Sequence, residues 1–161
     1  MTLLKTAYFS TPIGSVRVVG DEKALFGLDF VDELKKLDER CTSIDSIEEE
    51  LQLYFQGKLR EFKTPLQIEG TPFQKKVWEE LRKIPYGTTI SYSELAIAIG
   101  LPKARRAVAQ ANGANRFAVL IPCHRVIQAD GRIGGYNSGI SKKVWLLEHE
   151  QEGGKCRKLF R

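Results

Sequence analysis

The stretch SYSELAIAIGLPKARRAVAQANG, residues 91–113, has the pattern of two short helices joined by a turn. A capping box at residues 91–94 predicts the start of the first helix, and Gly100 predicts its end. The second helix is predicted to begin near Pro102, with small side chains on its inner face and Arg106 on the opposite face. The inner stripe comprises Ala104, Ala107, Val108 and Ala111. This arrangement is typical of a helix-turn-helix, a motif that binds DNA.

The residues before this motif predict one further helix and, earlier still, a small sheet. Thr71, followed by proline and a capping glutamine, predicts a helix that ends at Pro85. Turn signals at residues 11–14 and 20–23 separate three short apolar runs, which are predicted to form antiparallel strands. Apolar residues at helical spacing then predict a helix over residues 44–55.

The length and composition fit an α+β protein with two small domains. We expect an N-terminal domain over residues 1–70, with an antiparallel sheet and a helix, and a C-terminal domain over residues 71–161. Hydrophobic residues make up 42% of the 161 residues, which is enough to bury a core. No apolar run approaches the ~20 residues that span a bilayer, and the chain does not open with a signal peptide. A cytoplasmic location is therefore expected.

Cysteine and histidine usage argues against disulfide and metal chemistry. The three cysteines, Cys41, Cys123 and Cys156, are an odd number, lie far apart and include no Cys-x-x-Cys pair. The chain has two histidines, and neither belongs to a metal-binding motif. We expect no metal site and no cofactor, and for Cys41 and Cys156 we expect unreactive thiols.

The two halves of the chain carry opposite charge. Residues 1–70 contain 9 basic and 13 acidic side chains, whereas residues 71–161 contain 16 basic and 7 acidic side chains. A basic half of this kind indicates a surface that meets a polyanion, although a solvated lysine-rich surface is an equally good explanation of charge alone.

The stretch IPCHRVI, residues 121–127, contains the strongest candidate for a nucleophile. A cysteine reacts as its thiolate, and a nearby base or positive charge promotes that form. His124 and Arg125 directly follow Cys123 and supply both kinds of group. A core cysteine flanked by unrelated polar residues is the alternative that the spacing alone leaves open.

The segment Pro-Cys-His-Arg-Val, residues 122–126, resembles the active-site signature of the O6-alkylguanine-DNA alkyltransferases, also called methylated-DNA–protein-cysteine methyltransferases. Further segments of the family pattern occur in the family's order and spacing. They are Ser91–Ala96, Arg106–Val108, Asn115, Gly135–Tyr136 and Trp145–Glu150. The resemblance covers residues 71–151, and it extends to the first half only through the turn at residues 11–14. It implies a ribonuclease-H-like N-terminal domain and a winged-helix-like C-terminal domain.

The resemblance also implies a role for each reacting group. Cys123 would attack the alkyl carbon on the guanine oxygen and keep the alkyl group irreversibly as a thioether. His124, oriented by Glu150, would remove the thiol proton through a water molecule. Tyr92 would donate a proton to the guanine ring. Asn115 would tie the recognition helix to the cysteine loop.

A pocket for the base is implied as well. Tyr136 would form one wall, and the backbone carbonyls of Cys123 and Val126 would accept hydrogen bonds from the exocyclic amine of guanine. Asn137 and Ser138 would stand at the rim, where many relatives carry smaller residues. The range of alkyl groups, and activity on O4-alkylthymine, stay open.

Because a stacked base is out of reach of a protein thiol, the resemblance implies that the nucleotide is flipped out of duplex DNA. Arg106 would fill the vacated position while the recognition helix lies in the minor groove. The other residues expected to contact DNA are Arg105, Ser91, Ser93, Lys103, Ala107, Ala109, Gly113 and Arg125. The implied protein is a monomer that acts once.

Three alternative functions agree less well with the sequence. A Cys-His hydrolase normally has its catalytic pair far apart in sequence, and its local signatures are absent here. An alkyltransferase-like protein that binds the lesion without transfer would lack the nucleophile, whereas Cys123 is present. A helix-turn-helix regulator would leave the cysteine motif unexplained.

Overall fold

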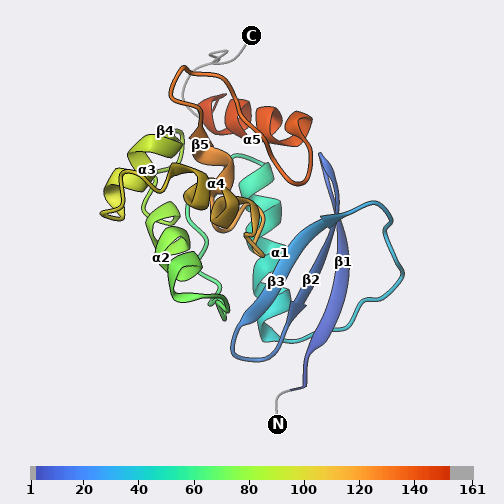
Figure 1. Ribbon diagram of the computed structural model, residues 1–161. Helices are drawn as coiled ribbons and strands as arrows, with labels where there is room; N and C mark the ends of the chain where they lie inside the picture. The colour runs from blue at the N-terminus through green and yellow to red at the C-terminus, as the bar shows by residue number, and fades with distance from the viewer. Residues whose placement is uncertain (1–2, 153–161) are drawn as a thin grey trace. The chain divides into compact units, whose positions relative to one another are not determined.

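The computed structural model describes residues 3–152, and these form two compact units (Figure 1). Among the described residues, the first unit comprises those up to Ile68 together with Arg116–Ala118, and the second comprises Glu69–Asn115 and those from Val119 onward. The observed division thus lies close to the predicted boundary after residue 70. The short return of the chain to the first unit was not predicted.

The first unit contains a three-stranded antiparallel sheet and one helix. The strands are β1 (Lys5–Thr11), β2 (Gly14–Gly20) and β3 (Leu25–Val31), in that spatial order, and the helix is α1 (Thr42–Phe55). The strands and the helix agree with the prediction. The helix buries the apolar residues that recur at its helical spacing. They are Ile44, Ile47, Leu51 and Tyr54.

The sheet also holds the segment that leads toward the cysteine motif. Leu28 of β3 donates its backbone N–H to Arg116 at 2.9 Å, and Ala118 donates to the carbonyl of Leu28 at 2.9 Å. The next residue, Val119, has a φ of +71°, which a β-branched residue rarely adopts. The chain therefore makes a strained turn where it leaves the first unit.

The second unit is mainly helical. Its helices are α2 (Pro72–Leu81), α3 (Tyr92–Ala98), α4 (Arg105–Gly113), the 3-10 turn η1 (Cys123–Arg125) and α5 (Ile140–Glu152). Two short parallel strands, β4 (Ile90–Ser91) and β5 (Val126–Ile127), pair beside α3. Both predicted capping boxes are present, because Thr71 and Ser91 each accept the backbone N–H three residues later. The predicted helix-turn-helix corresponds to α3 and α4.

The inner face of α4 differs from the predicted stripe. The helix begins at Arg105, later than predicted, and Ala104 is its N-cap residue. Val108, Ala111 and Asn112 are buried, whereas Ala107 is exposed. The buried face is thus rotated toward Asn112, and it packs against α2, where Trp78 donates its indole N–H to the carbonyl of Ala111 at 2.8 Å.

Cys41 is a buried free thiol at the start of α1, and Cys156 lies outside the described residues. Among residues 3–152, no three His, Cys, Asp or Glu side chains are placed to bind a metal ion together. The helices of this same range are all too short or too polar to cross a membrane.

Candidate active site

The turn η1 presents three chemically distinct side chains in a row. Cys123, His124 and Arg125 are all buried, and the turn is closed by a hydrogen bond from the Arg125 N–H to the carbonyl of Pro122 at 3.0 Å. A 3-10 helix has three residues per turn, so successive side chains point about 120° apart. The three side chains therefore leave the turn in different directions.

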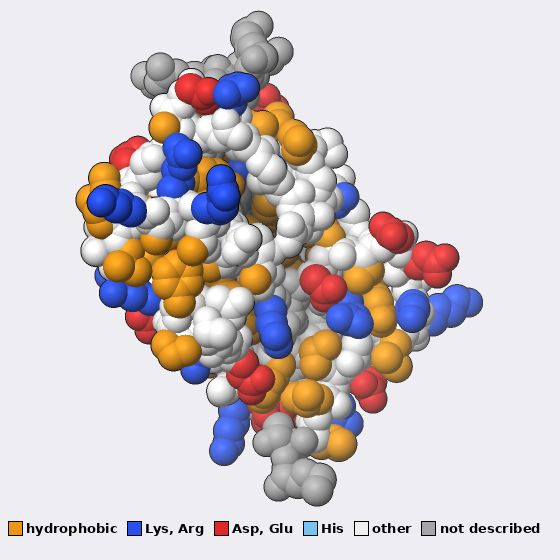
Figure 2. Space-filling view, in the orientation of Figure 1, with side chains coloured by type: hydrophobic (Ala, Val, Ile, Leu, Met, Phe, Trp, Pro, Cys, Tyr) orange, Lys and Arg blue, Asp and Glu red, His pale blue; other side chains and the backbone are white. Residues whose placement is uncertain are grey.

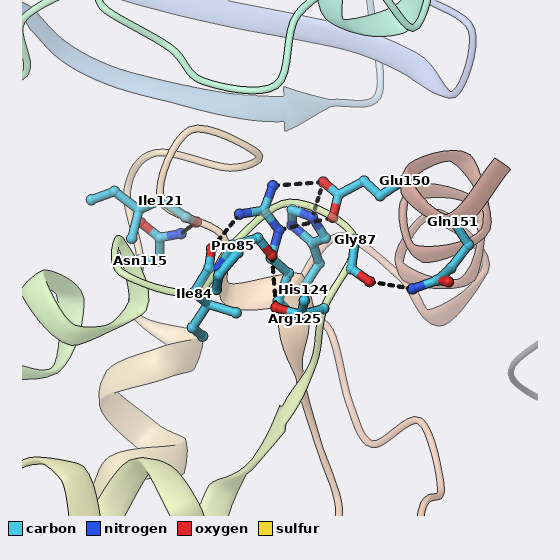
Figure 3. Close-up of polar contacts among 10 residues, drawn as sticks. Ile84, Pro85, Gly87, Asn115, Ile121, His124, Arg125, Glu150 and Gln151 are labelled. Atoms are coloured by element: carbon cyan, nitrogen blue, oxygen red, sulfur yellow. Dashed lines mark hydrogen bonds and ion pairs between the residues drawn. The ribbon is translucent and has the colours of Figure 1, made fainter. Parts of the chain in front are cut away.

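His124 and Arg125 converge on one carboxylate of α5 (Figure 3). The His124 Nε2 lies 2.8 Å from Glu150 Oε2, and the Arg125 guanidinium donates to both Glu150 oxygens at 2.8 and 2.9 Å. Burial alone would raise the pKa of Glu150, but His124 and Arg125 together hold it well below its usual range. Glu150 is therefore an anion that fixes the His124 ring. Among the described residues, His124 Nδ1 has no hydrogen-bond partner, although it is buried.

The prediction that Arg125 contacts DNA is wrong. Its side chain is buried, and the guanidinium donates to the carbonyl of Ile84 at 2.7 Å as well as to Glu150. These contacts use the groups that a phosphate would need. Arg125 instead connects α5 to the end of the α2 segment and holds Glu150 in place.

Two asparagines anchor the segment around Cys123. Asn115 donates its side-chain N–H to the carbonyl of Ile121 at 2.8 Å, which links the end of α4 to the cysteine loop. Asn112 lies 3.4 Å from the carbonyl of Cys123 and also hydrogen-bonds the Tyr92 side chain. Sequence analysis identified Asn115 but missed Asn112. The available signal was that Asn112 lies four residues after Val108, on the same face of the helix.

The Cys123 thiol is protonated at rest. Burial raises its pKa, and a hydrogen bond with Asn115 and the positive charge of Lys143 offset that effect only in part. A thiol in this state needs a base at the moment of attack. His124, with its fixed ring, is the neighbouring group that can serve as one.

Two tyrosines lie close to Cys123. Burial, followed by the proximity of Cys123, raises the pKa of Tyr92. The same causes raise the pKa of Tyr136 further, and its buried hydroxyl has no hydrogen-bond partner within residues 3–152. Both phenols therefore keep their protons and can donate them or hydrogen-bond a ligand.

The predicted rim residues lie in the loop between β5 and α5. Asn137 donates its side-chain amide to the carbonyl of Gly113 at the end of α4, and Ser138 is half-buried. The carbonyl of Val126 accepts from Lys143, a buried lysine that sequence analysis missed. The available signal was its spacing, because Lys143 lies three and seven residues before Leu146 and Glu150 on the inner face of α5.

The predicted DNA-contacting residues divide by exposure. Lys103, Arg105, Arg106 and Ala107 are exposed, and Ser93, Ala109 and Gly113 are half-buried. Ser91 is buried, and its hydroxyl accepts the Glu94 N–H as the cap of α3. The Ser91 hydroxyl therefore already has a partner within the protein, and its contact with a phosphate stays a prediction.

The start of α4 is strongly positive. The first turn has two arginines, no acidic residue and no side-chain cap, so the positive end of the helix dipole adds to the side-chain charge. Figure 2 shows Lys and Arg side chains over the region where Figure 1 places α3 and the turn that follows it. An exposed positive surface of this kind suits a polyanion.

Two family models match the chain. Residues 4–68 match the family model described as "6-O-methylguanine DNA methyltransferase, ribonuclease-like domain". Residues 72–152 match "6-O-methylguanine DNA methyltransferase, DNA binding domain". The chain belongs to the O6-methylguanine DNA methyltransferase family. The resemblance found in the sequence is thereby confirmed, as are the two-domain α+β fold and the type of enzyme.

Relatives of the methyltransferase family match over nearly the whole chain. A methylated-DNA–protein-cysteine methyltransferase of Methanosarcina acetivorans is 43% identical over 156 residues, covering 93% of this chain and 98% of the relative. The crystal structure of the Mycobacterium tuberculosis O6-methylguanine methyltransferase has a TM-score of 0.86 and 37% identity, covering 96% of this chain and 97% of that one. A structure of the same mycobacterial protein in complex with DNA is 38% identical, covers 98% and 99% of the two chains, and also has a TM-score of 0.86.

Proposed function

We propose that this protein repairs DNA by moving the alkyl group of O6-alkylguanine onto Cys123, once per molecule. The observation that carries the proposal is the 2.8 Å contact that fixes the buried His124 ring on Glu150, directly after the buried Cys123 in the chain. A fixed base beside a protonated thiol supports nucleophilic catalysis. Family membership supplies the substrate class.

The attack on the alkyl group is coupled to loss of the thiol proton. His124 takes this proton through a water molecule, and Glu150 stabilises the imidazolium that results. A sulfur–carbon bond forms as the bond between the carbon and the guanine oxygen breaks. The electron pair of the broken bond stays with guanine. Because the thioether is stable, Cys123 is not regenerated.

The departing guanine gains a proton as the thiol loses one. Tyr92 is the proposed donor, because its phenol lies near Cys123 and is protonated at neutral pH. Tyr136 brings a buried hydroxyl to the proposed base pocket. The carbonyls of Cys123 and Val126 accept from the exocyclic amine, which favours guanine over adenine.

The DNA face is proposed to be α4 with the turn before it. Arg106 fills the position of the flipped nucleotide, and Lys103 and Arg105 contact phosphates. The small side chains of Ala107 and Ala109 allow close approach to the minor groove.

We propose that the protein acts as a monomer. The cytoplasmic location expected from the sequence stays a prediction.

The first experiment is intact-protein mass spectrometry after incubation with duplex DNA that carries one O6-methylguanine. We expect a gain of one CH₂ unit per molecule, and peptide mapping should locate it on Cys123. The Cys123→Ser variant should show no gain and should still bind the lesion. Transfer by this variant would contradict the assignment of the nucleophile. Binding by the natural protein without any gain would instead indicate a lesion-binding protein.

A second experiment separates base flipping from chemistry. The Arg106→Ala variant should lose about 100-fold in transfer rate from duplex DNA, because the vacated stack is no longer filled. Its rate with free O6-benzylguanine should change less than about threefold, since a free base does not need flipping. Arg82→Ala, an exposed arginine after α2, is the matched control. Equal losses on both substrates would contradict the proposed role of Arg106.

A further inference from the structure

The turn between α2 and β4, residues 85–88, is fixed by hydrogen bonds of its own. Thr88 donates its backbone N–H at 3.1 Å and its hydroxyl at 2.8 Å to the carbonyl of Pro85. Gly87, the third residue of the turn, has a φ of +80°, as a type II turn requires. The groups on both sides of the turn therefore have defined directions.

On one side, the turn and the residue before it meet the Arg125 guanidinium. The carbonyl of Ile84 accepts a hydrogen bond from the guanidinium at 2.7 Å. The centre of the half-buried Tyr86 ring lies 5.7 Å from the guanidinium carbon, within the range of a cation–π interaction. The guanidinium also donates to both oxygens of Glu150, at 2.8 and 2.9 Å. Arg125 is thus held between this turn and the carboxylate.

On the other side, the turn meets α5 at the residue that follows Glu150. The carbonyl of Gly87 accepts a hydrogen bond from the side-chain amide of Gln151 (Figure 3). The backbones also approach closely here, because a Cβ at Gly87 would lie 3.4 Å from the Glu150 carbonyl oxygen. The turn therefore contacts both the partner of the carboxylate and the backbone that carries it.

The position of this carboxylate decides how the His124 ring is held. A carboxylate anion only accepts hydrogen bonds, so the His124 Nε2, at 2.8 Å from Glu150, is the donor and Nδ1 keeps the free electron pair. We infer that the turn at residues 85–88 positions His124, because Tyr86 and Gly87 hold the two sides of the Arg125–Glu150 pair. This inference rests on the proposed function, in which His124 is the base. Tyr86 and Gln151 are positioning residues that act through this pair.

The kinetic test is single-turnover transfer from free O6-benzylguanine over a range of concentrations. In Tyr86→Leu, loss of a partly buried cation–π interaction should lower the maximum rate about tenfold. In Gln151→Leu, loss of the hydrogen bond to Gly87 should lower it about fivefold. The half-saturating concentration should change less than about twofold in both variants, because neither residue belongs to the proposed base pocket.

A spectroscopic test separates positioning of the ring from a general loss of structure. In NMR spectra of protein with isotope-labelled histidine, the Nε2–H of His124 should give a resolved resonance, assigned by its absence in His124→Gln. This resonance should shift or broaden in Tyr86→Leu and in Gln151→Leu, because the ring is no longer fixed on Glu150. It does not depend on alkyl transfer. If the natural protein transferred no benzyl group, the proposed function would fail, and the resonance would still show whether the turn holds His124.

Two control variants complete the test. Tyr86→Phe keeps the ring face and should recover most of the rate and the natural resonance. Tyr8→Leu removes a half-buried tyrosine of β1 in the first unit and should change neither. An unchanged rate and resonance in folded Tyr86→Leu and Gln151→Leu would overturn the inference, and Gln151→Leu alone decides if Tyr86→Leu does not fold. An equal loss of rate in Tyr86→Phe and Tyr86→Leu would also overturn it.

Discussion

Arg40 in the first unit forms ion pairs with three carboxylates at the surface, whereas Arg125 in the second unit forms an ion pair with one carboxylate in the core. The partners of Arg40 are Asp38, Asp45 and Glu48, all with a contact within 2.8 Å. The Arg40 side chain is 36% exposed, and its partners are exposed at least as much. Arg125 is 8% exposed and binds Glu150, which is 1% exposed and also contacts His124.

The two networks differ in how strongly each charge depends on its partners. At the surface, water solvates every charge, so loss of one partner leaves no charge unsatisfied. In the core, each charge depends on the others because water does not replace a missing partner. The carboxylate that orients His124 therefore belongs to a network that tolerates no single loss. This couples the reactivity of the site to the stability of the second unit.

The largest effect is expected for Glu150→Gln. The substitution leaves the Arg125 charge buried without an anion, so the free energy of unfolding should fall by about 3–5 kcal/mol. The transfer rate should fall at least about 100-fold, because His124 loses the group that orients it and stabilises its charge. Urea unfolding gives the first quantity, and single-turnover alkyl transfer gives the second.

Glu48→Gln in the Arg40 network is the matched control for this substitution. It also neutralises one carboxylate beside an arginine, but the change in unfolding free energy should stay below about 1 kcal/mol, with unchanged transfer. Similar losses of stability in the two variants would show that burial does not separate the two networks.

The pH dependence of stability should separate the networks as well. His124 and Arg125 hold the pKa of Glu150 below its unfolded value of about 4.3, so its ionisation stabilises the folded state above that pH. The contribution is lost as the pH falls through 4.3 toward the lower folded pKa. The stability advantage of the natural protein over Glu150→Gln should therefore shrink in acid. Urea unfolding of both proteins at pH 7, 5 and 3.5 measures it, and an advantage that stays constant would contradict the role of the charge.

Much of the fold followed from local patterns in the sequence. The turn at residues 11–14, both capping boxes and the helix-turn-helix depend on contacts between residues close in the chain. The return of residues 116–118 to β3 was not predicted, because it depends on a backbone pairing between distant segments. The buried face of α4 was misjudged because alanine fits both a buried and an exposed position, so the stripe did not fix the rotation of the helix.

The site shows a similar division. The residues of the family motif, such as Cys123 and His124, were found because they form a contiguous signature. Arg125 was assigned to DNA because its charge was known and its burial was not. Asn112 and Lys143 were missed because their roles arise from backbone carbonyls that carry no sequence signal of their own. The sequence pattern thus points to the groups that are proposed to react more directly than to the groups that hold them.

A small effect is also expected for Arg40→Met, which keeps a side chain of similar length but removes the guanidinium that lies 5.7 Å from the centre of the Phe9 ring. Although three ion pairs are lost, the free energy of unfolding should fall by less than about 1.5 kcal/mol in dilute buffer, because every charge stays solvated. In 1 M salt, where screening acts over about 3 Å, most of this difference should disappear. The loss caused by Glu150→Gln should persist in the same salt, since the buried charges are screened much less. A loss in Arg40→Met that is large and insensitive to salt would mean that the surface network is as rigid as the one in the core.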